Sequence, residues 1–256
     1  MRGDSCVACA GRIVLQAKES AARNLARQLS SRSRYPVMYR LIVGLSLCAA
    51  CLERLPVIGD EICEQCGREY AADRLCQDCH KITGETIQNN RSLLRYNEWG
   101  KDLLGTYKYR GEERLATFYA KLLTMVVYRY HAETSFDCIA TVPLHGQRLQ
   151  ERGFNQVDLL AKRLGADIGV PVRSLLLRTK RTAKLSLQAG RSAREESMDG
   201  AFSWVGECLG KAGKGSYRIL LLDDIYTTGS TLRSCAKTIR EHAGPHSHIY
   251  SITIYR

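Results

Sequence analysis

The chain has 256 residues, of which 45% are hydrophobic and 25% charged. An apolar fraction of this size can form a core, and the ordinary charge content excludes a globally disordered chain. The length suits one α/β domain with a small appendage. Lys and Arg outnumber Asp and Glu by 38 to 26, which gives a formal net charge of +12. That charge indicates a polyanionic partner, either nucleic acid or a phosphate-rich substrate, or else only a basic surface.

The N-terminus carries no targeting segment, because residues 1–6 lack the apolar stretch of a signal peptide. The longest apolar run, residues 41–52, is interrupted by Gly44 and Ser46. A bilayer span needs roughly 20 apolar residues, so we expect no membrane span. The sequence therefore predicts a cytoplasmic protein, and its eleven cysteines in a reducing compartment indicate metal binding instead of disulfides.

Eight of the cysteines form four Cys-x-x-Cys pairs in the N-terminal third. Such a pair forms a tight knuckle whose two thiolates face one metal ion, and two knuckles complete a tetrahedral four-cysteine zinc site. The last two pairs lie close together in sequence and predict one site. The first two pairs most simply form a second site across residues 10–47, although the spacing also allows an interleaved pairing. The four pairs are Cys6/Cys9, Cys48/Cys51, Cys63/Cys66 and Cys76/Cys79.

Two other cofactors are compatible with parts of this pattern. Residues 76–80 match the motif that attaches a c-type haem, and an iron–sulfur cluster is a further alternative. Evenly paired knuckles without an export signal favour zinc over both. Eight thiolates close two coordination shells, so we expect structural zinc ions and an ordinary surface role for His80. The lone cysteines are expected to be small buried hydrophobes. They are Cys138, Cys208 and Cys235.

Residues 1–87 are predicted to form a double zinc-ribbon module with a helical insertion at residues 10–47. Within the insertion, residues 16–29 are rich in Ala with scattered Arg and predict a helix, which the Ser-rich run up to Pro36 ends. We interpret this segment as a basic surface helix.

Strands and helices alternate through residues 88–256, which we take as the second domain. This order predicts a parallel sheet flanked by helices. The expected elements are a mostly helical stretch at 102–130, a strand at 137–143, a helix at 155–164, a strand at 217–222, a helix at 230–242 and a strand at 249–255.

The chemistry that the sequence offers follows the strand at 217–222. Asp223 and Asp224 come directly after its last apolar residue, at the edge where α/β sheets place their ligands. A turn containing Gly229 leads into a helix whose first N–H groups are unpaired and attract phosphate. Because carboxylates repel phosphate, we expect them to accept hydrogen bonds from vicinal sugar hydroxyls. The hydroxyl donors around the turn are Thr227, Thr228, Ser230 and Thr231.

Residues 219–231 resemble the motif with which type I phosphoribosyltransferases bind phosphoribosyl diphosphate (PRPP). The resemblance implies the fold of that class for residues 88–256. It also implies that Asp223 and Asp224, the candidate catalytic residues, hold the ribose 2′- and 3′-hydroxyls. Residues 227–231 would wrap the 5′-phosphate, and Mg2+ would bridge the ribose hydroxyls and the diphosphate.

A second block, residues 142–156, is similar to the Val-Pro-Leu…Arg…Arg-Gly-Phe-Asn-Gln block of the ComF family. Proteins of that family are phosphoribosyltransferase-like and linked to competence and DNA uptake. Residues 108–111, Lys-Tyr-Arg-Gly, and the cysteine knuckles match further parts of it, so the match covers nearly the whole chain apart from the insertion. It implies that Arg148 and Arg152 supply cations to the diphosphate and that Gln156 caps or positions the loop. Both arginines also suit a solvated helix surface.

Residues 178–194 form a basic segment without an acid. The fold class implies a mobile flap that closes over the site and excludes water. Its cations would stabilise the departing diphosphate or grip single-stranded nucleic acid. Arg194 matches a family position, but Ser197 replaces a frequent Asn and residues 195–196 are acidic, which weakens any catalytic role here. The cations are Arg178, Lys180, Arg181, Lys184, Arg191 and Arg194.

Two functions are consistent with these features. The first is a phosphoribosyltransferase that binds Mg–PRPP and transfers phosphoribosyl to an unidentified acceptor, in association with competence and DNA uptake. The alternative is a non-catalytic module that binds single-stranded DNA and retains the PRPP site.

Overall fold

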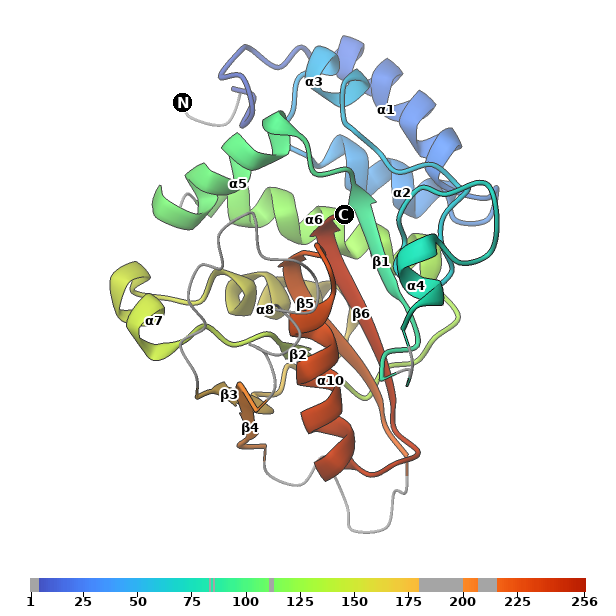
Figure 1. Ribbon diagram of the computed structural model, residues 1–256. Coiled ribbons are helices and arrows are strands. Elements are labelled where there is room, and N and C mark those ends of the chain that lie inside the picture. The colour runs from blue at the N-terminus through green and yellow to red at the C-terminus, as the bar shows by residue number, and fades with distance from the viewer. Residues whose placement is uncertain (1–4, 83, 85, 111–112, 180–199, 207–215) are drawn as a thin grey trace.

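The computed structural model describes residues 5–82, 84, 86–110, 113–179, 200–206 and 216–256. Helices of the N-terminal third cover one end of the molecule, and the sheet and its helices form the remainder (Figure 1). The N-terminal helices are α1 (Leu15–Leu29), α2 (Tyr35–Val43), α3 (Ala49–Glu53) and α4 (Gln77–His80).

The predicted helix at 16–29 is confirmed as α1, which ends at Leu29. Its buried residues recur at helical spacing and are apolar except for Lys18, whereas Arg23 and Arg27 are exposed on the outer face. The Ser-rich run also starts a helix that the sequence analysis did not predict, because Pro36 stands in the first turn of α2, where a missing N–H costs nothing. Met38 and Ile42 of α2 are fully buried, and α2 contacts α1 and α6 (Glu113–Tyr130).

The central sheet has four parallel strands in the order β1-β6-β5-β2. β5 is an inner strand, and its apolar run is buried on both faces, as in other parallel sheets whose faces are covered by helices. The parallel sheet predicted from the sequence is confirmed, and β1 is an additional edge strand that was not predicted. The strands are β1 (Asn90–Leu94), β2 (Cys138–Thr141), β5 (Arg218–Ile225) and β6 (His248–Tyr255).

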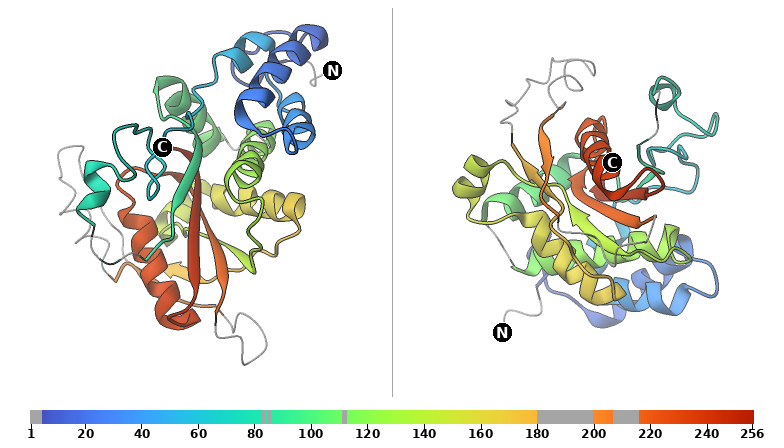
Figure 2. Two further views of the ribbon diagram at one scale, coloured as in Figure 1. Left: turned by 90° about the vertical axis from the view of Figure 1, so that its right-hand side faces the viewer. Right: turned by 90° about the horizontal axis from the view of Figure 1, so that it is seen from below.

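Helices cover both faces of this sheet, as Figure 2 shows. Alternate residues of a strand point to opposite faces. Leu220 and Leu222 pack with α6 and α8 (Gln156–Ile168), whereas Ile219 and Leu221 pack with α10 (Ser230–Ala243). The fold class is therefore α/β with a small N-terminal zinc-ribbon module, as predicted. The remaining elements are α5 (Glu98–Arg110), α7 (Gly146–Arg152) and an antiparallel pair of short strands, β3 (Leu176–Arg178) and β4 (Phe202–Trp204).

None of the described helices has the length and apolarity that a membrane crossing needs. The domain boundary between residues 87 and 88 stays a prediction.

Two glycines of α5 give a matched test of this packing. A Cβ added at Gly100 would lie 2.6 Å from Cε1 of Tyr255, a fully buried ring, whereas a Cβ added at Gly105 meets no atom within 4 Å. We expect Gly100→Ala to lower the free energy of unfolding by about 1–3 kcal/mol through overpacking. Gly105→Ala should raise it by about 0.5–1 kcal/mol through helix propensity. Urea unfolding of both variants is the measurement, and equal effects would contradict the packing described.

Candidate functional site

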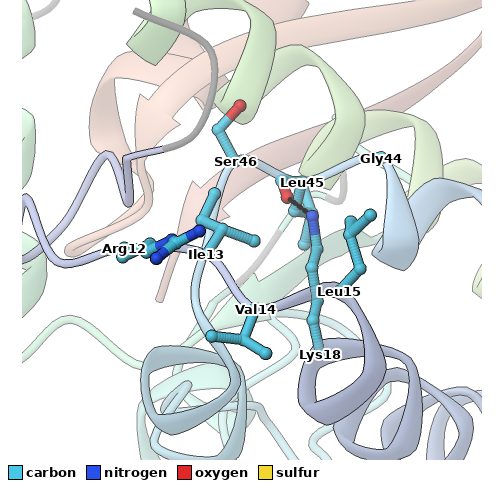
Figure 3. A pocket seen from close by; sticks show the side chains of 8 residues that line it. All are labelled: Arg12, Ile13, Val14, Leu15, Lys18, Gly44, Leu45 and Ser46. Atoms are coloured by element: carbon cyan, nitrogen blue, oxygen red, sulfur yellow. Dashed lines mark hydrogen bonds between the residues drawn. The ribbon is translucent and has the colours of Figure 1, made fainter.

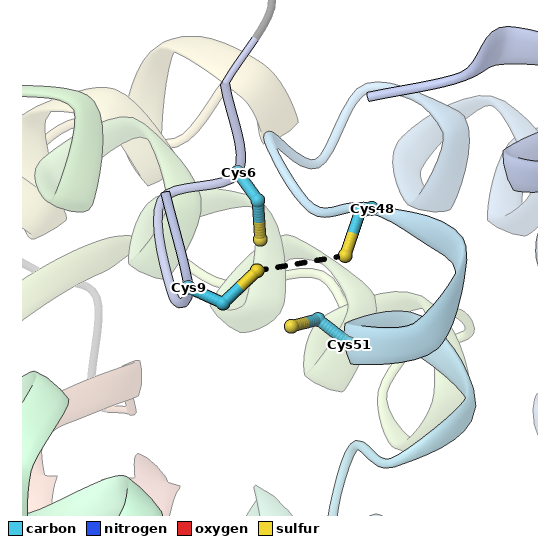
Figure 4. A group of neighbouring side chains, drawn as sticks. All are labelled: Cys6, Cys9, Cys48 and Cys51. Carbon is cyan, nitrogen blue, oxygen red and sulfur yellow. Dashed lines mark hydrogen bonds between the residues drawn. The ribbon is translucent and has the colours of Figure 1, made fainter. Parts of the chain in front are cut away.

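Four cysteines from two distant segments converge near the N-terminus (Figure 4). Their sulfur atoms all lie within 4.8 Å of one another, and Cys9 Sγ is 3.7 Å from Cys48 Sγ. Tetrahedral zinc with Zn–S bonds of about 2.3 Å separates its sulfurs by about 3.8 Å. The arrangement therefore fits zinc and confirms the simple pairing of the first two knuckles over an interleaved one. The members are Cys6, Cys9, Cys48 and Cys51.

The second cluster consists of buried cysteines only. Cys66 Sγ is 3.7 Å from Cys76 Sγ, and the Cys76 backbone N–H donates to Cys63 Sγ at 3.3 Å. The hydrogen bond from the Cys79 thiol, together with Arg256, lowers the pKa of Cys66 to about 4 against the opposing effect of burial, which favours the thiolate that a metal requires. The members are Cys63, Cys66, Cys76 and Cys79.

Each cluster offers four thiolates and so closes a tetrahedral shell, which makes both zinc sites structural. His80 is exposed and lies beside Asp73, with 3.2 Å between Nε2 and Oδ2, outside the ligand set as predicted. Cys138 and Cys235 are buried as expected. Cys208 lies outside the described residues.

The acidic pair stands at the carboxyl end of β5. The pairing with β2 ends at Leu222, while β5 continues beside β6, so Asp223 and Asp224 extend past the neighbouring strand. Burial, followed by the charge of Asp224, raises the pKa of Asp223 to about 7. The Asp224 backbone N–H donates to Asp223 Oδ1 at 2.8 Å. Two acids held together in this way require hydrogen-bond donors or a cation.

Lys108 near the end of α5 supplies one such cation. Its ammonium group forms an ion pair with the Asp224 carboxylate, and each of the two side chains is 20% exposed. In the sequence, Lys108 stands out only as part of the Lys-Tyr-Arg-Gly match, which implies no role for it. That motif was the available signal, but the contact joins residues too far apart in sequence to be predicted from spacing.

The turn after the acidic pair forms a cup of backbone N–H groups. Gly229 has φ +76° and precedes α10 without a side-chain cap. A Cβ at this position would lie 2.2 Å from Tyr226 Oη, so only glycine fits. Within the described part of the chain, no hydrogen bond uses the N–H groups of Thr227, Thr228, Gly229, Thr231 or Leu232. Unpaired amides at a helix start attract an anion.

Hydroxyl groups surround the same cup. Thr228 Oγ1 lies 3.0 Å from Ser230 Oγ, which is 8% exposed, and Thr231 is half-buried. Thr227 is exposed to solvent. The predicted donors are therefore gathered around the turn, beside the acidic pair.

One of the predicted arginines, Arg178, lies within electrostatic reach of the acidic pair. Residues His145 and Arg178 form a parallel bridge, which brings the segment after Pro143 next to β3. Burial, followed by the charge of Arg148, lowers the pKa of Arg178, and Asp223 opposes this shift. Arg178 is thus within electrostatic reach of both Arg148 and Asp223.

Arg152 takes another position. Its Nη1 donates to Gln156 Oε1 at 3.2 Å, and Gln156 Nε2 donates to the Lys108 carbonyl at 3.0 Å. The Tyr107 hydroxyl donates to the Gln156 carbonyl at 2.9 Å. These bonds join the 152–156 block to α5, so Gln156 positions the segment that carries Lys108. Arg194 and the rest of the predicted flap, residues 180–194, lie outside the described residues.

A separate pocket of about 610 Å3 lies where α1 begins, beside residues 44–46 (Figure 3). Lys18 is buried and donates to the Leu45 carbonyl at 2.6 Å, and Lys121 donates to the Gly44 carbonyl at 2.6 Å. Both cations face carbonyls that follow the carboxyl end of α2, so they satisfy the helix end and its dipole.

The raised pKa of Asp223 predicts how stability depends on pH. The native carboxyl keeps a proton up to about pH 7, whereas the unfolded carboxyl loses it near its ordinary value of 3.8. The unfolded state therefore binds fewer protons in this window, and stability falls as pH rises through it. We expect Asp223→Asn to stabilise the protein, with a gain about 1–3 kcal/mol larger at pH 8 than at pH 5. Thermal unfolding of wild type and variant without Mg2+ measures the gain in stability. An equal gain at pH 5 and pH 8 would contradict the raised pKa of Asp223.

Comparison with known proteins found a matching family model, relatives in sequence and a solved structure with partial similarity. The Double zinc ribbon domain matches residues 42–80. Competence protein ComFC of Bacillus subtilis is 26% identical over 238 residues, covering 90% of this chain and 92% of that protein. Adenine phosphoribosyltransferase from Leishmania tarentolae superposes with a TM-score of 0.34 at 15% identity, covering 57% of this chain and 59% of that one.

A second relative is more similar in sequence. Competence protein ComFC of Streptococcus pneumoniae is 32% identical over 196 residues, covering 76% of this chain and 81% of that protein. Identity at this level over most of both chains, with the zinc-ribbon match and the blocks at 108–111, 142–156 and 219–231, shows that the chain belongs to the ComF family.

Proposed function

We propose that this protein binds Mg–PRPP at the carboxyl end of β5 and transfers its phosphoribosyl group to an acceptor. The observation that carries the proposal is the pairing of two features at one strand end. An acidic pair, Asp223 and Asp224, stands directly before a cup of unpaired backbone amides around Gly229. A sugar phosphate has the complementary pair of groups, a phosphate for the amides and a vicinal diol for the carboxylates.

The acids and the amides take different parts of the ligand. Residues 227–231 receive the 5′-phosphate, because amide N–H groups and hydroxyls both donate to phosphate oxygens. Asp223 and Asp224 accept from the ribose 2′- and 3′-hydroxyls. Mg2+ prefers oxygen ligands and keeps several waters, so it would be held beside Asp223 and Asp224 without an all-protein cage and would neutralise part of the diphosphate charge. Lys108 already pairs with Asp224 and stays available to a diphosphate oxygen on the same side.

In the transfer step, the bond between ribose C1 and the diphosphate oxygen breaks and a bond from C1 to the acceptor forms. The diphosphate leaves with the bonding electron pair, and the acceptor loses its proton to solvent or to the diphosphate. Arg178 and Arg148 stabilise the charge that develops on the diphosphate, because Arg178 is within electrostatic reach of Asp223 and Arg148 is within electrostatic reach of Arg178. Arg194 serves the same anion in this proposal.

Calorimetric titration with Mg–PRPP tests the site. We expect the double variant Asp223→Asn with Asp224→Asn to bind at least about 100-fold more weakly than wild type, since several charge-assisted hydrogen bonds are lost. Asp137→Asn is the matched control, because Asp137 contacts Arg218 at the opposite end of the sheet. Wild-type affinity in the double variant would refute the assignment of the acids.

Transfer has its own readout in diphosphate release from Mg–PRPP with a panel of nucleobases and amines. Binding without release with any acceptor would contradict catalysis and leave binding in place.

Single-stranded DNA is the second candidate ligand, and the names of the relatives favour it. Both proteins reported above are competence proteins, and this chain has a net charge of +12. Affinity for a single-stranded oligonucleotide is expected to fall about 10-fold or more between 50 and 200 mM salt, because bound phosphates release counterions. Fluorescence anisotropy measures this, with a neutral-backbone oligonucleotide as control. An affinity that is the same at both salt concentrations and for the neutral-backbone oligonucleotide would contradict an electrostatic interface.

A further inference from the structure

Arg256 follows β6 and lies between the second zinc cluster and the phosphate-binding turn. Its backbone is held on both sides, since its N–H donates to the Leu94 carbonyl at 2.9 Å and its own carbonyl accepts from Tyr96 N–H at 3.0 Å. The side chain therefore starts from a fixed point at the end of the sheet.

On one side, the guanidinium contacts a zinc ligand. Nε donates to the Cys66 carbonyl at 3.1 Å, and Nη2 donates to Cys66 Sγ at 3.2 Å. Hydrogen bonds to a ligating sulfur fix the orientation of the ligand and are part of how a metal site is held.

On the other side, the same guanidinium contacts the turn. Nη1 donates to the Tyr226 carbonyl at 3.3 Å and to the Thr227 carbonyl at 3.1 Å. The carbon Cζ lies 4.7 Å from the centre of the Tyr226 ring, a cation–π distance. All three guanidinium nitrogens thus donate hydrogen bonds. This arrangement requires the planar, forked group of arginine, and the single ammonium group of lysine would not reproduce it.

Tyr226 carries the contact on to the phosphate cup. Its side chain is 6% exposed, and its hydroxyl lies so close beneath Gly229 that no Cβ fits between them. A cavity of about 110 Å3 lies between Cys79 and Thr228, so the zinc cluster and the turn do not pack tightly against each other there. The Arg256 guanidinium lines this cavity and contacts both sides.

We infer that Arg256 is a positioning residue through which the zinc cluster of Cys63–Cys79 holds the phosphate-binding turn in its open, amide-presenting shape. Zinc in this cluster fixes Cys66, Cys66 and the sheet fix Arg256, and Arg256 fixes residues 226–227. The identity of the ligand that binds the turn rests on the function proposed above. The effect of Arg256 on the rigidity of the turn does not depend on that function. Binding coupled in this way is reciprocal, so Mg–PRPP also raises the affinity of this cluster for zinc by the same factor.

Backbone relaxation measured by NMR tests the mechanical part without any ligand. We expect Arg256→Ala and Arg256→Lys to lower the order parameters of Thr227–Gly229 from about 0.85 to below about 0.6. Arg218→Ala is the matched control, since Arg218 is an exposed arginine at the other end of β5. Unchanged order parameters in Arg256→Ala, or full rescue by lysine, would overturn the inference.

Calorimetry with Mg–PRPP tests the coupling to zinc. Arg256→Ala and Cys79→Ser should each bind about 10-fold more weakly than wild type, a loss that corresponds to one or two charge-assisted hydrogen bonds. His80→Ala should bind like wild type, because His80 is exposed and lies outside the ligand set of the same cluster. Equal losses in Cys79→Ser and His80→Ala, or no loss in Arg256→Ala, would overturn the coupling. If wild type binds no PRPP, the proposed function fails and the order parameters alone decide the inference.

Discussion

Parallel pairing of β5 with both of its neighbours determines where the chemical groups of the site lie. Four apolar residues, Ile219–Leu222, pack alternately on the two helical layers and fix the register with β2 and β6. The ladder with β2 stops at Leu222, so the next two residues leave the sheet on one side while β6 still supports them on the other. Whatever follows Leu222 is therefore placed at the sheet edge, and here it is an acidic pair followed by a glycine turn.

That placement brings two carboxylates close together, which is electrostatically unfavourable. Two adjacent carboxylates lie half-buried, and the pKa of Asp223 is raised because burial and Asp224 both disfavour its charge. A site selected only for stability would contain no such pair. Lys108 relieves part of the conflict, and Gln156 holds the helix end that presents Lys108. The blocks at 108–111 and 152–156, far apart in sequence, thus act on the same two carboxylates, which is a physical reason for both to occur in one chain.

The sequence analysis was most successful where the chemistry is local. The knuckles and the glycine before a helix are each specified within a few residues, and the structure contains both. The strand was predicted to end at residue 222, whereas β5 continues to Ile225 through its pairing with β6, so the two acids belong to the strand. Edge strand β1 was missed because Asn90, Arg91 and Ser92 do not look like a strand, and they become one only by pairing with β6 and by hydrogen bonding to Gln65 and Thr253. The ion pair of Lys108 and the contacts of Arg256 were missed for the same reason. Both join distant segments, and a charged residue alone does not indicate its partner.

The second zinc cluster is built into the sheet and is not an appendage to it. Its cysteines belong to the same hydrophobic cluster as Ile219, Leu221 and the inner face of α10. The knuckle backbone is also bonded to β1, since the Gln65 carbonyl accepts from Asn90 N–H and the Glu64 carbonyl accepts from Arg91 Nη1. Zinc in this cluster therefore contributes to the order of the polar first part of β1, Asn90–Ser92, whereas Leu93 and Leu94 are held by full burial. Metal–thiolate bonds add rigidity to this part of the edge strand, and the turn at Gly229 follows β5, which β6 separates from β1.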